Sequence, residues 1–227
     1  MARDSNADGD AERRRPDAER TRQAILAAAL EEFAAHGLSG ARVDAIAART
    51  STVKRMIYYY FGSKEGLYLA VLEGAYAAIR RDEQALGLDW LPPLEAIRRL
   101  VEFTFDYEEA HPEFIRLVSI ENIHNGRHIA ESKTIQAVNS PVIATLARVL
   151  DRGKRDGVFR PSVEPTDVHM LISAVCFFRV SNRHTFGALF GCDLLDPAMR
   201  ARHKAMLVDA VLHLLVAAGS GGKAEAA

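Results

Sequence analysis

Residues 43–67, VDAIAARTSTVKRMIYYYFGSKEGL, constrain the fold of this chain more than any other segment. Val43, Ile46 and Ala47 recur at the three- and four-residue spacing that places side chains on one face of a helix. The polar triplet at residues 50–52 then interrupts this pattern with side chains that cap helices and bend chains. A second helical pattern follows directly. The segment therefore predicts two short helices joined by a tight turn, a helix-turn-helix.

The second helix of this pair carries cationic and aromatic side chains away from its apolar side. Ile57 and Phe61 fall on one side of that helix, so the other side is left to face solvent or a partner. The cations between positions 42 and 64 are Arg42, Arg49, Lys54, Arg55 and Lys64, and Asp44 is the only acidic residue there. Each phosphate that such a patch neutralises releases condensed counterions, even though the whole chain has a net charge of -1. We therefore expect this helix to contact double-stranded DNA.

These residues resemble the N-terminal signature of the TetR family of transcriptional regulators. The matching residues are Lys54, the block Tyr58-Tyr59-Tyr60-Phe61, and Ser63-Lys64-Glu65 at the start of a helix. The resemblance covers roughly Thr21 to Leu72, and the remaining chain is similar only in length and helical character. It implies that Lys54, Arg55 and Met56 face base edges, and that Tyr58, Tyr59 and Lys64 grip phosphates near Arg42. The full expected DNA-binding set is Arg42, Thr52, Lys54, Arg55, Met56, Tyr58, Tyr59, Tyr60 and Lys64.

Two residues in the turn depart from the family pattern. Ser51 stands where the family usually has Gly, and Val53 stands where it usually has Ser. A positive φ angle at Ser51 would cost about 1 kcal/mol, because only Gly enters that region freely. Thr52 is then the expected cap of the second helix.

Arg55 is the strongest candidate for reading sequence, because a guanidinium can bond guanine O6 and N7 together, worth about 1–3 kcal/mol of discrimination. The structural alternative for the cations is a solvated helix face. For the tyrosines it is core packing with polar tips at the surface.

The composition of the chain and the positions of its helix-breaking Pro and Gly residues predict an all-α fold in two domains. The 227 residues are 48% hydrophobic and 26% charged, which is typical of a globular chain with a sizeable core. Cys176 and Cys192 have no paired spacing, no secretory signal is recognisable, and no apolar run is long enough to span a membrane. We therefore expect a cytoplasmic protein with reduced thiols.

The predicted domains follow from where helical patterns start and stop. Residues 1–17 are expected to be a disordered charged arm, with Arg13, Arg14 and Arg15 either lying in a DNA groove or simply solvated. Residues 18–63 form the predicted DNA-binding domain of three helices, the first of which ends at Gly37. Residues 64–218 form the predicted larger helical domain for effector binding and dimerisation, and 219–227 a disordered tail.

Helices are expected throughout the larger domain, because Pro and Gly separate stretches of helical periodicity. The first begins after Ser63 and runs toward Glu83, coupling the two domains. The others are expected at Pro92–Ala110, Glu113–Asn125, Ile129–Gly153, Pro165–His184 and Pro197–Ala218. The last helix has a broad apolar stripe that includes Leu207, Val211 and Leu214. The stripe fits either an internal core or a partner subunit, and the family resemblance implies a homodimer through the last two helices.

A small-molecule site is expected where polar residues end an apolar helical face. The residues of this hypothetical site are Phe103, Tyr107, Phe114, Glu121, His124, Asn125, Phe178 and Arg179. The alternative is an ordinary solvated helix end. Arg179 lies on a very apolar helical face, so it needs either an anionic partner such as a ligand carboxylate, or a position at a dimer interface or in solvent.

Other classes of site have weaker support. Glu121, His124 and His128 have helical spacing suited to a metal, but no fourth ligand is recognisable, so we expect no metal and no cofactor. No catalytic motif is present around His169, Cys176 and His184, so we expect no catalytic residues. The prediction is thus a ligand-responsive regulator, a repressor released from operator DNA by an unknown small molecule. The alternatives are a helical enzyme and a helical adaptor that binds only proteins.

Overall fold

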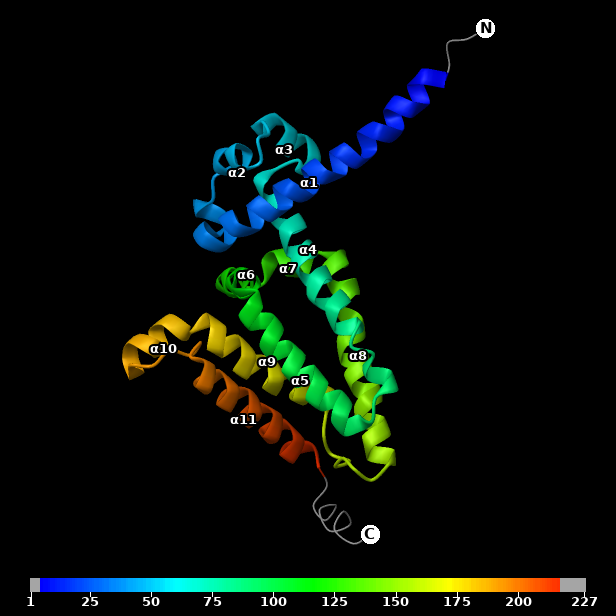
Figure 1. The fold of residues 1–227 in the computed structure, drawn as a ribbon, viewed down its shortest axis with the longest axis vertical. Coiled ribbons are helices and arrows are strands. Elements are labelled where there is room, and N and C mark those ends of the chain that lie inside the picture. Colours follow the sequence, from blue (N-terminus) through cyan, green and yellow to red (C-terminus); the bar gives the residue numbers. More distant parts are fainter. Residues whose placement is uncertain (1–4, 217–227) are drawn as a thin grey trace. The chain divides into compact units, whose positions relative to one another are not determined.

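The computed structural model describes residues 5–216, with side chains described from residue 17, and this part of the chain is helical (Figure 1). The elements are α1 (Ser5–Gly40), α2 (Val43–Arg49), α3 (Lys54–Phe61), α4 (Lys64–Gln84), the 3-10 turn η1 (Leu88–Trp90), α5 (Pro93–Ala110), α6 (Pro112–Ile123), α7 (Arg127–Glu131), α8 (Lys133–Arg155), α9 (Pro165–Ser181), α10 (Arg183–Phe190) and α11 (Pro197–Leu215). Between residues 5 and 216 the extended pairing is limited to one antiparallel bridge, Phe159 with Val216. The all-α prediction is confirmed.

The chain divides into two compact units. The first unit contains the described residues up to Ala75 together with Arg116–Ser132, and the second contains Tyr76–Ile115 with the described residues from Lys133 onward. The sequence predicts a boundary after Ser63. In the structure, the start of α4 and the segment around α7 instead belong to the same unit as the helix-turn-helix. No helix in the described part of the chain is long and apolar enough to cross a membrane.

The core of the first unit is built where α1, α2, α3 and α4 converge. Ile25, Phe33, Ile46, Ile57 and Tyr68 are each fully buried, and the rings of Phe33 and Tyr68 meet edge to face with centroids 5.1 Å apart. A three-helix bundle of this size buries too little apolar surface to be secure alone. Tyr68, contributed by α4, therefore extends the core that holds the helix-turn-helix.

The first helix begins earlier than its sequence predicts. α1 starts at Ser5, whereas an unstructured arm was expected up to residue 17, because residues 11–20 are rich in Ala, Glu and Arg, which favour helix. The arginines at 13–15 lie in this helix, and their side chains lie outside the described part, as does the predicted tail at 219–227. Gly37, with φ 67°, breaks the regular helix where a stop was predicted.

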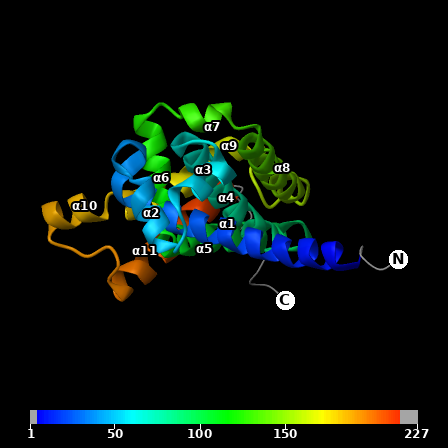
Figure 2. The ribbon, with the colours of Figure 1, turned by 90° about the horizontal axis from the view of Figure 1, so that it is seen from above.

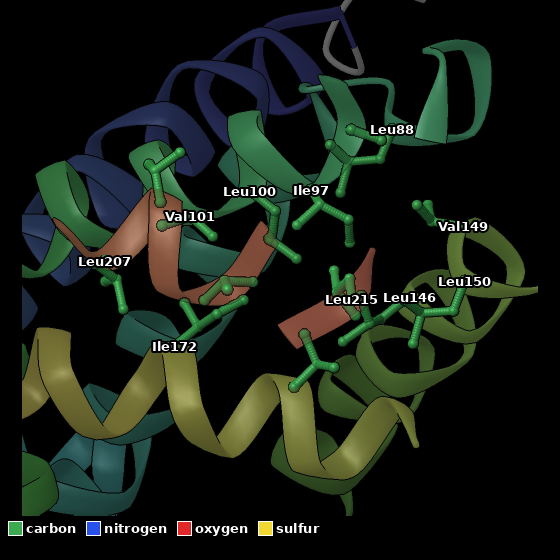
Figure 3. Packing of buried hydrophobic residues seen from close by; sticks show 14 of the residues in the cluster. Leu88, Ile97, Leu100, Val101, Leu146, Val149, Leu150, Ile172, Leu207 and Leu215 are labelled. Atoms are coloured by element: carbon green, nitrogen blue, oxygen red, sulfur yellow. The ribbon is translucent and has the colours of Figure 1, made fainter. Parts of the chain in front are cut away.

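The core of the second unit lies among α5, α8, α9 and α11 (Figure 3). Leucine, isoleucine and valine side chains from these helices and from η1 point toward one another, among them Ile97, Leu146, Ile172 and Leu215. Gly153 allows the Phe159 ring to lie against α8, since a Cβ at Gly153 would be 2.0 Å from that ring. The prediction of a sizeable apolar core is met within this unit.

Two helix boundaries differ from the sequence prediction. The helix expected at Ile129–Gly153 is two helices, α7 and α8, because Ser132 is extended and its hydroxyl donates a hydrogen bond to Glu73 Oε1 at 2.7 Å. The helix expected to reach His184 ends at Ser181, and a separate helix, α10, follows. Figure 2 shows α10 projecting from the end of α9, away from α8. No residue of α10 is buried.

Candidate nucleic-acid interface and effector cavities

The helix-turn-helix is held to α1 by a buried carboxylate. Glu32 is buried, and its Oε1 accepts the backbone N–H of Arg42 at 2.9 Å, one residue before α2 begins. Arg42 itself points its side chain into solvent. The carboxylate thus satisfies a backbone donor at the helix start and fixes where α2 leaves the loop.

The turn between α2 and α3 has a strained backbone conformation at the position where the family usually has Gly. Ser51 has φ 50°, a left-handed conformation, in the position where Gly would be free of strain. The Thr52 backbone N–H donates to Ala47 O at 3.1 Å, which closes the turn. The predicted cap at Thr52 is wrong: Val53 occupies the N-cap of α3, and no side chain caps that helix.

The outward face of α3 carries the predicted DNA-contacting side chains. Ile57 is the only residue that α3 buries, so the helix presents its other faces outward. Lys54, Arg55, Tyr58 and Tyr59 are exposed, whereas Thr52, Met56, Tyr60 and Lys64 are half-buried. The structure therefore brings the predicted set together on the surface of one unit. Their contacts with DNA stay a prediction.

Three of the cations between positions 42 and 64 have partners in the first unit, and one of them is Arg49, which pairs with Glu31. Lys54 Nζ lies 3.1 Å from Asp44 Oδ2, and Lys64 Nζ donates to Ser39 O at 3.2 Å. The Lys54 pair is largely exposed, and such pairs contribute only about 0–1 kcal/mol, so a phosphate can replace the carboxylate. The Arg55 side chain is exposed and makes no hydrogen bond or ion pair with the residues that the structure describes.

The start of α4 is set close behind α3. Ser63 Oγ accepts the backbone N–H of Gly66 at 2.9 Å, which confirms Ser63 as the predicted cap of α4. A Cβ at Gly66 would lie 2.1 Å from the Phe61 carbonyl oxygen, so this turn can be this tight only with glycine. Tyr60 packs between Tyr59 and Phe61, with ring centroids 5.5 Å and 6.2 Å away.

The predicted small-molecule residues fall into both units. Glu121, His124 and Asn125 belong to the first unit, and Phe103, Tyr107, Phe114, Phe178 and Arg179 belong to the second. Within the second unit these five residues do not share one pocket. Phe114 packs edge to face on Tyr76 with centroids 5.2 Å apart, and Phe178 packs in the same way on Phe186 at 5.8 Å.

Glu121 is fully occupied by partners from its own unit. Its Oε1 accepts the Tyr68 hydroxyl at 2.9 Å and lies 2.8 Å from His128 Nδ1. Its Oε2 accepts the backbone N–H groups of His128 at 3.2 Å and Ile129 at 3.4 Å. The carboxylate is 1% exposed, so these partners supply the hydrogen bonds that solvent cannot. Sequence reasoning missed Tyr68, which resembles an ordinary core residue in the helical pattern.

His124 and His128, which share helical spacing with Glu121, differ in their positions. The His124 and His128 rings are perpendicular, with centroids 6.5 Å apart. Among the residues that the structure describes, no group of three His, Cys, Asp or Glu side chains is arranged to hold a metal ion.

Arg179 is buried within its own chain and has an acidic partner there. Its Nη2 donates to Glu109 Oε2 at 3.1 Å and to the Leu194 carbonyl at 2.8 Å, and its Nη1 contacts His203 Nδ1. The guanidinium carbon lies 4.5 Å from the centre of the Phe105 ring. These contacts compensate the positive charge of Arg179 within the chain, so it needs neither a ligand nor a second subunit as a partner.

Phe103 and Tyr107 line an open groove of about 430 Å³ on α5, beside Leu86. Their rings are tilted with centroids 5.5 Å apart, and burial raises the pKa of the Tyr107 hydroxyl. These are the two predicted ligand residues that the structure places side by side.

A second, more enclosed cavity of about 310 Å³ lies among α4, η1 and α8. Leu88, Val138 and Val142 line it, and Arg80 and Glu83, which form an ion pair, stand in its wall. Burial raises the pKa of Glu83, although the nearby positive charge of Arg80 acts to lower it. Sequence reasoning missed this cavity, because η1 and the crossing of α4 with α8 leave no periodic signal.

A polar cluster next to Arg80 has unsatisfied groups. Arg80 Nε and Glu108 Oε2 have no hydrogen-bond partner among the described residues, and Glu108 is 6% exposed. Burial raises the pKa of Glu108 to about 8, and the Arg80 charge opposes that rise. Burial, reinforced by Arg80, lowers the pKa of His169. Glu108 therefore keeps its proton at neutral pH, because burial disfavours its charged form.

Cys176 lacks the environment of a catalytic nucleophile. Burial, and then the nearby Glu108 carboxyl, raise the pKa of its thiol far above the usual range. A thiol that stays protonated is a poor nucleophile. The enzyme alternative therefore gains no support from this residue.

Comparison with known proteins agrees with the geometry of α3. Residues 25–71 match the bacterial regulatory proteins of the tetR family, and residues 93–211 match the tetracyclin repressor-like C-terminal domain. The chain is 37% identical to the HTH-type transcriptional repressor NicS of Pseudomonas putida over 86% of this chain and 92% of that protein. It is 33% identical to the repressor SCO4008 of Streptomyces coelicolor, over 72% of this chain and 80% of that protein.

A solved structure extends the similarity to the fold. The crystal structure of the transcriptional regulator SCO4942 from Streptomyces coelicolor aligns with a TM-score of 0.64 and 32% identity, covering 86% of this chain and 98% of that chain. The matched N-terminal segment contains α2, α3 and the exposed cations described above. The chain therefore belongs to the TetR family of DNA-binding transcriptional regulators.

Proposed function

We propose that this protein is a homodimeric repressor that binds operator DNA through α3 and leaves it when a small molecule binds the second unit. The observation that carries the proposal is the outward face of α3, where Arg55, Lys54 and Tyr59 are exposed beside a single buried anchor, Ile57. NicS and SCO4008, both named repressors, support the direction of regulation. Near-complete release would require the effector to favour the non-binding state by about 5.5 kcal/mol.

The surface of α9 and α11 supports the dimer. Met170 and Phe178 on α9 are 66% and 46% exposed, and Met206 and Leu214 on α11 are 54% and 40% exposed. Large apolar side chains gathered on two neighbouring helices mark an interaction surface. A homodimer with two-fold symmetry presents two copies of α3, so its operator should contain two half-sites related by the same symmetry.

A DNA titration tests the proposal. Fluorescence anisotropy with a labelled fragment from the upstream region of the gene should show saturation at two chains per fragment and an affinity that falls as salt rises. Arg55→Ala should weaken binding by roughly 5–150-fold for each half-site, equivalent to about 1–3 kcal/mol for each bidentate guanine contact.

Arg98→Ala is the matched control, because Arg98 is an exposed cation on α5, outside the helix-turn-helix. It should bind like the parent protein. Equal losses in Arg98→Ala and Arg55→Ala, or affinity that does not depend on salt, would contradict the assignment of α3 as the DNA-reading helix.

We place the effector in the cavity among α4, η1 and α8. Its volume of about 310 Å³ suits a small organic molecule, and it combines an apolar wall with the half-buried Arg80–Glu83 pair. Such a pair can exchange partners with a polar ligand group. The open groove at Phe103 and Tyr107 is the second candidate, supported by its two adjacent rings.

A bulky residue in the cavity should abolish effector binding and leave DNA binding intact. Val142→Trp fills the cavity, whereas Ala144→Trp adds the same ring to an exposed position on α8 that does not line it. In a thermal-shift screen of small organic molecules, compounds that stabilise the parent protein and Ala144→Trp should leave the melting temperature of Val142→Trp unchanged. A normal shift in Val142→Trp would exclude this cavity and favour the groove.

A further inference from the structure

Val53 is an exposed apolar residue at the start of the DNA-reading helix. It is 62% exposed and occupies the N-cap of α3 with an extended backbone, φ -104° and ψ 145°. It lies outside the residues that the sequence analysis assigned to DNA contact. Neither the core of the first unit nor a described neighbour covers its side chain to a large extent.

Helix capping does not explain Val53. Ser, Thr, Asp and Asn are favoured at the N-cap because their side-chain oxygens accept a backbone N–H of the first turn, and losing such a cap costs about 1 kcal/mol. Val53 makes no side-chain cap hydrogen bond. The valine therefore gives up stability at the helix start and gains little from burial, which is typical of residues selected for function.

The position of Val53 is nevertheless well fixed. Its carbonyl accepts the Met56 backbone N–H at 2.8 Å, and the preceding residue, Thr52, donates its N–H to Ala47 O at 3.1 Å. A β-branched side chain on a fixed backbone has few rotamers, so its methyl groups hold a defined direction. Such a side chain is ready for contact with a partner and loses little entropy on binding.

We infer that Val53 is a specificity-determining residue whose methyl groups contact the 5-methyl group of a thymine in the operator. The inference rests on the proposed function, in which α3 enters the major groove. The N-terminal residues of a recognition helix contact base edges there, and thymine is the base that presents a methyl group in that groove. Two residues away, Arg55 presents the donors that suit guanine. Each half-site then contains a thymine close to the guanine that Arg55 reads.

Replacing thymine with uracil tests this contact, because uracil lacks only the methyl group. An operator fragment is first selected from random double-stranded DNA with the full chain, and its thymines are then replaced by uracil one at a time. The parent protein should lose about fourfold in affinity at one thymine per half-site, which corresponds to ~0.8 kcal/mol for one buried methyl group. Replacements elsewhere should change little.

Variants at position 53 identify the residue responsible. Val53→Ser removes the methyl groups and restores a cap, so it should bind the thymine and uracil fragments equally while remaining folded. Val53→Ile keeps the branched apolar side chain and should keep the preference for thymine. Tyr59→Phe, which alters an exposed neighbour on α3, is the matched control and should also keep it.

The outcomes separate this inference from the proposed function. Salt-dependent binding with no uracil-sensitive position, or an undiminished preference in Val53→Ser, would overturn the role of Val53 and leave DNA binding by α3 in place. Failure of the parent protein to select any DNA sequence would overturn the proposed function and the inference together.

Discussion

Replacing Glu108 with glutamine should make the protein clearly more stable at alkaline pH. The Glu108 carboxyl is 6% exposed, and burial raises its pKa to about 8 from the model-compound value of 4.5. The native state therefore holds a proton that the unfolded state has released between these two values. Stability falls as pH rises through this range, by on the order of 5 kcal/mol in total at about 1.4 kcal/mol for each pH unit.

Chemical unfolding at pH 5, 7 and 9 measures this effect. The parent protein should lose stability between pH 5 and pH 9, and Glu108→Gln should lose less because its side chain stays neutral throughout. Partial burial also raises the pKa of Glu83, so Glu83 contributes in the same direction and leaves a smaller slope in the variant.

His169 should make the stability of the protein depend on pH in the acid range as well. Its pKa is lowered by burial and by Arg80, so its contribution to stability is present at neutral pH and is lost as pH falls through the lowered value.

The control for Glu108→Gln is Glu102→Gln, on the same helix as Glu108 but only half-buried, which should keep the parent pH profile. An unchanged alkaline slope in Glu108→Gln would show that Glu108 is already ionised in the native protein.

Replacing Glu121 with leucine should destabilise the first unit by about 3 kcal/mol or more. The leucine fills a similar volume but leaves the Tyr68 hydroxyl, the His128 ring and the backbone N–H groups of His128 and Ile129 without their acceptor. Each buried polar group left unpaired costs about 1–3 kcal/mol. At about 2–4 °C per kcal/mol for a chain of this size, the melting temperature should fall by roughly 6–12 °C.

Two milder variants show whether the loss of stability comes from the missing hydrogen-bond acceptor at position 121. Tyr68→Phe removes one donor and should cost only about 1 kcal/mol, while Glu121→Gln keeps one acceptor oxygen and should fall between the two. Thermal unfolding followed by circular dichroism ranks the three. A melting temperature for Glu121→Leu equal to that of the parent protein would mean that solvent satisfies the donors.

The helix-turn-helix could be predicted from the sequence because its signals are local. The apolar spacing of Ile46 and Ile57, the polar turn and the Ser63 cap each concern residues within a few positions of one another. The same locality allowed the positive φ of Ser51 to be anticipated. The N-cap was misplaced by one residue, because Thr52 is a better capping residue than Val53 and the cap preference was followed.

The surroundings of Glu121 and Arg179 could not be predicted, because they depend on which helices cross. Periodicity placed Glu121 and Arg179 on faces that change polarity, but it does not show what lies opposite. In the structure Tyr68 and Glu109 lie opposite them, respectively, and supply hydrogen-bonding or acidic partners from distant parts of the chain. The break between α7 and α8 at Ser132 could not be predicted for the same reason, since the Ser132 hydroxyl donates a hydrogen bond to Glu73, which is far away in sequence.

The membership of Arg116–Ser132 in the first unit bears on how chimeric regulators could be assembled from this protein. Cutting after Ala75 would transplant Tyr68 without its acceptor, Glu121, and Glu73 without its donor, Ser132. A graft that exchanges operator preference between relatives should therefore carry both stretches of chain together, or substitute Phe at position 68 to suit the new host.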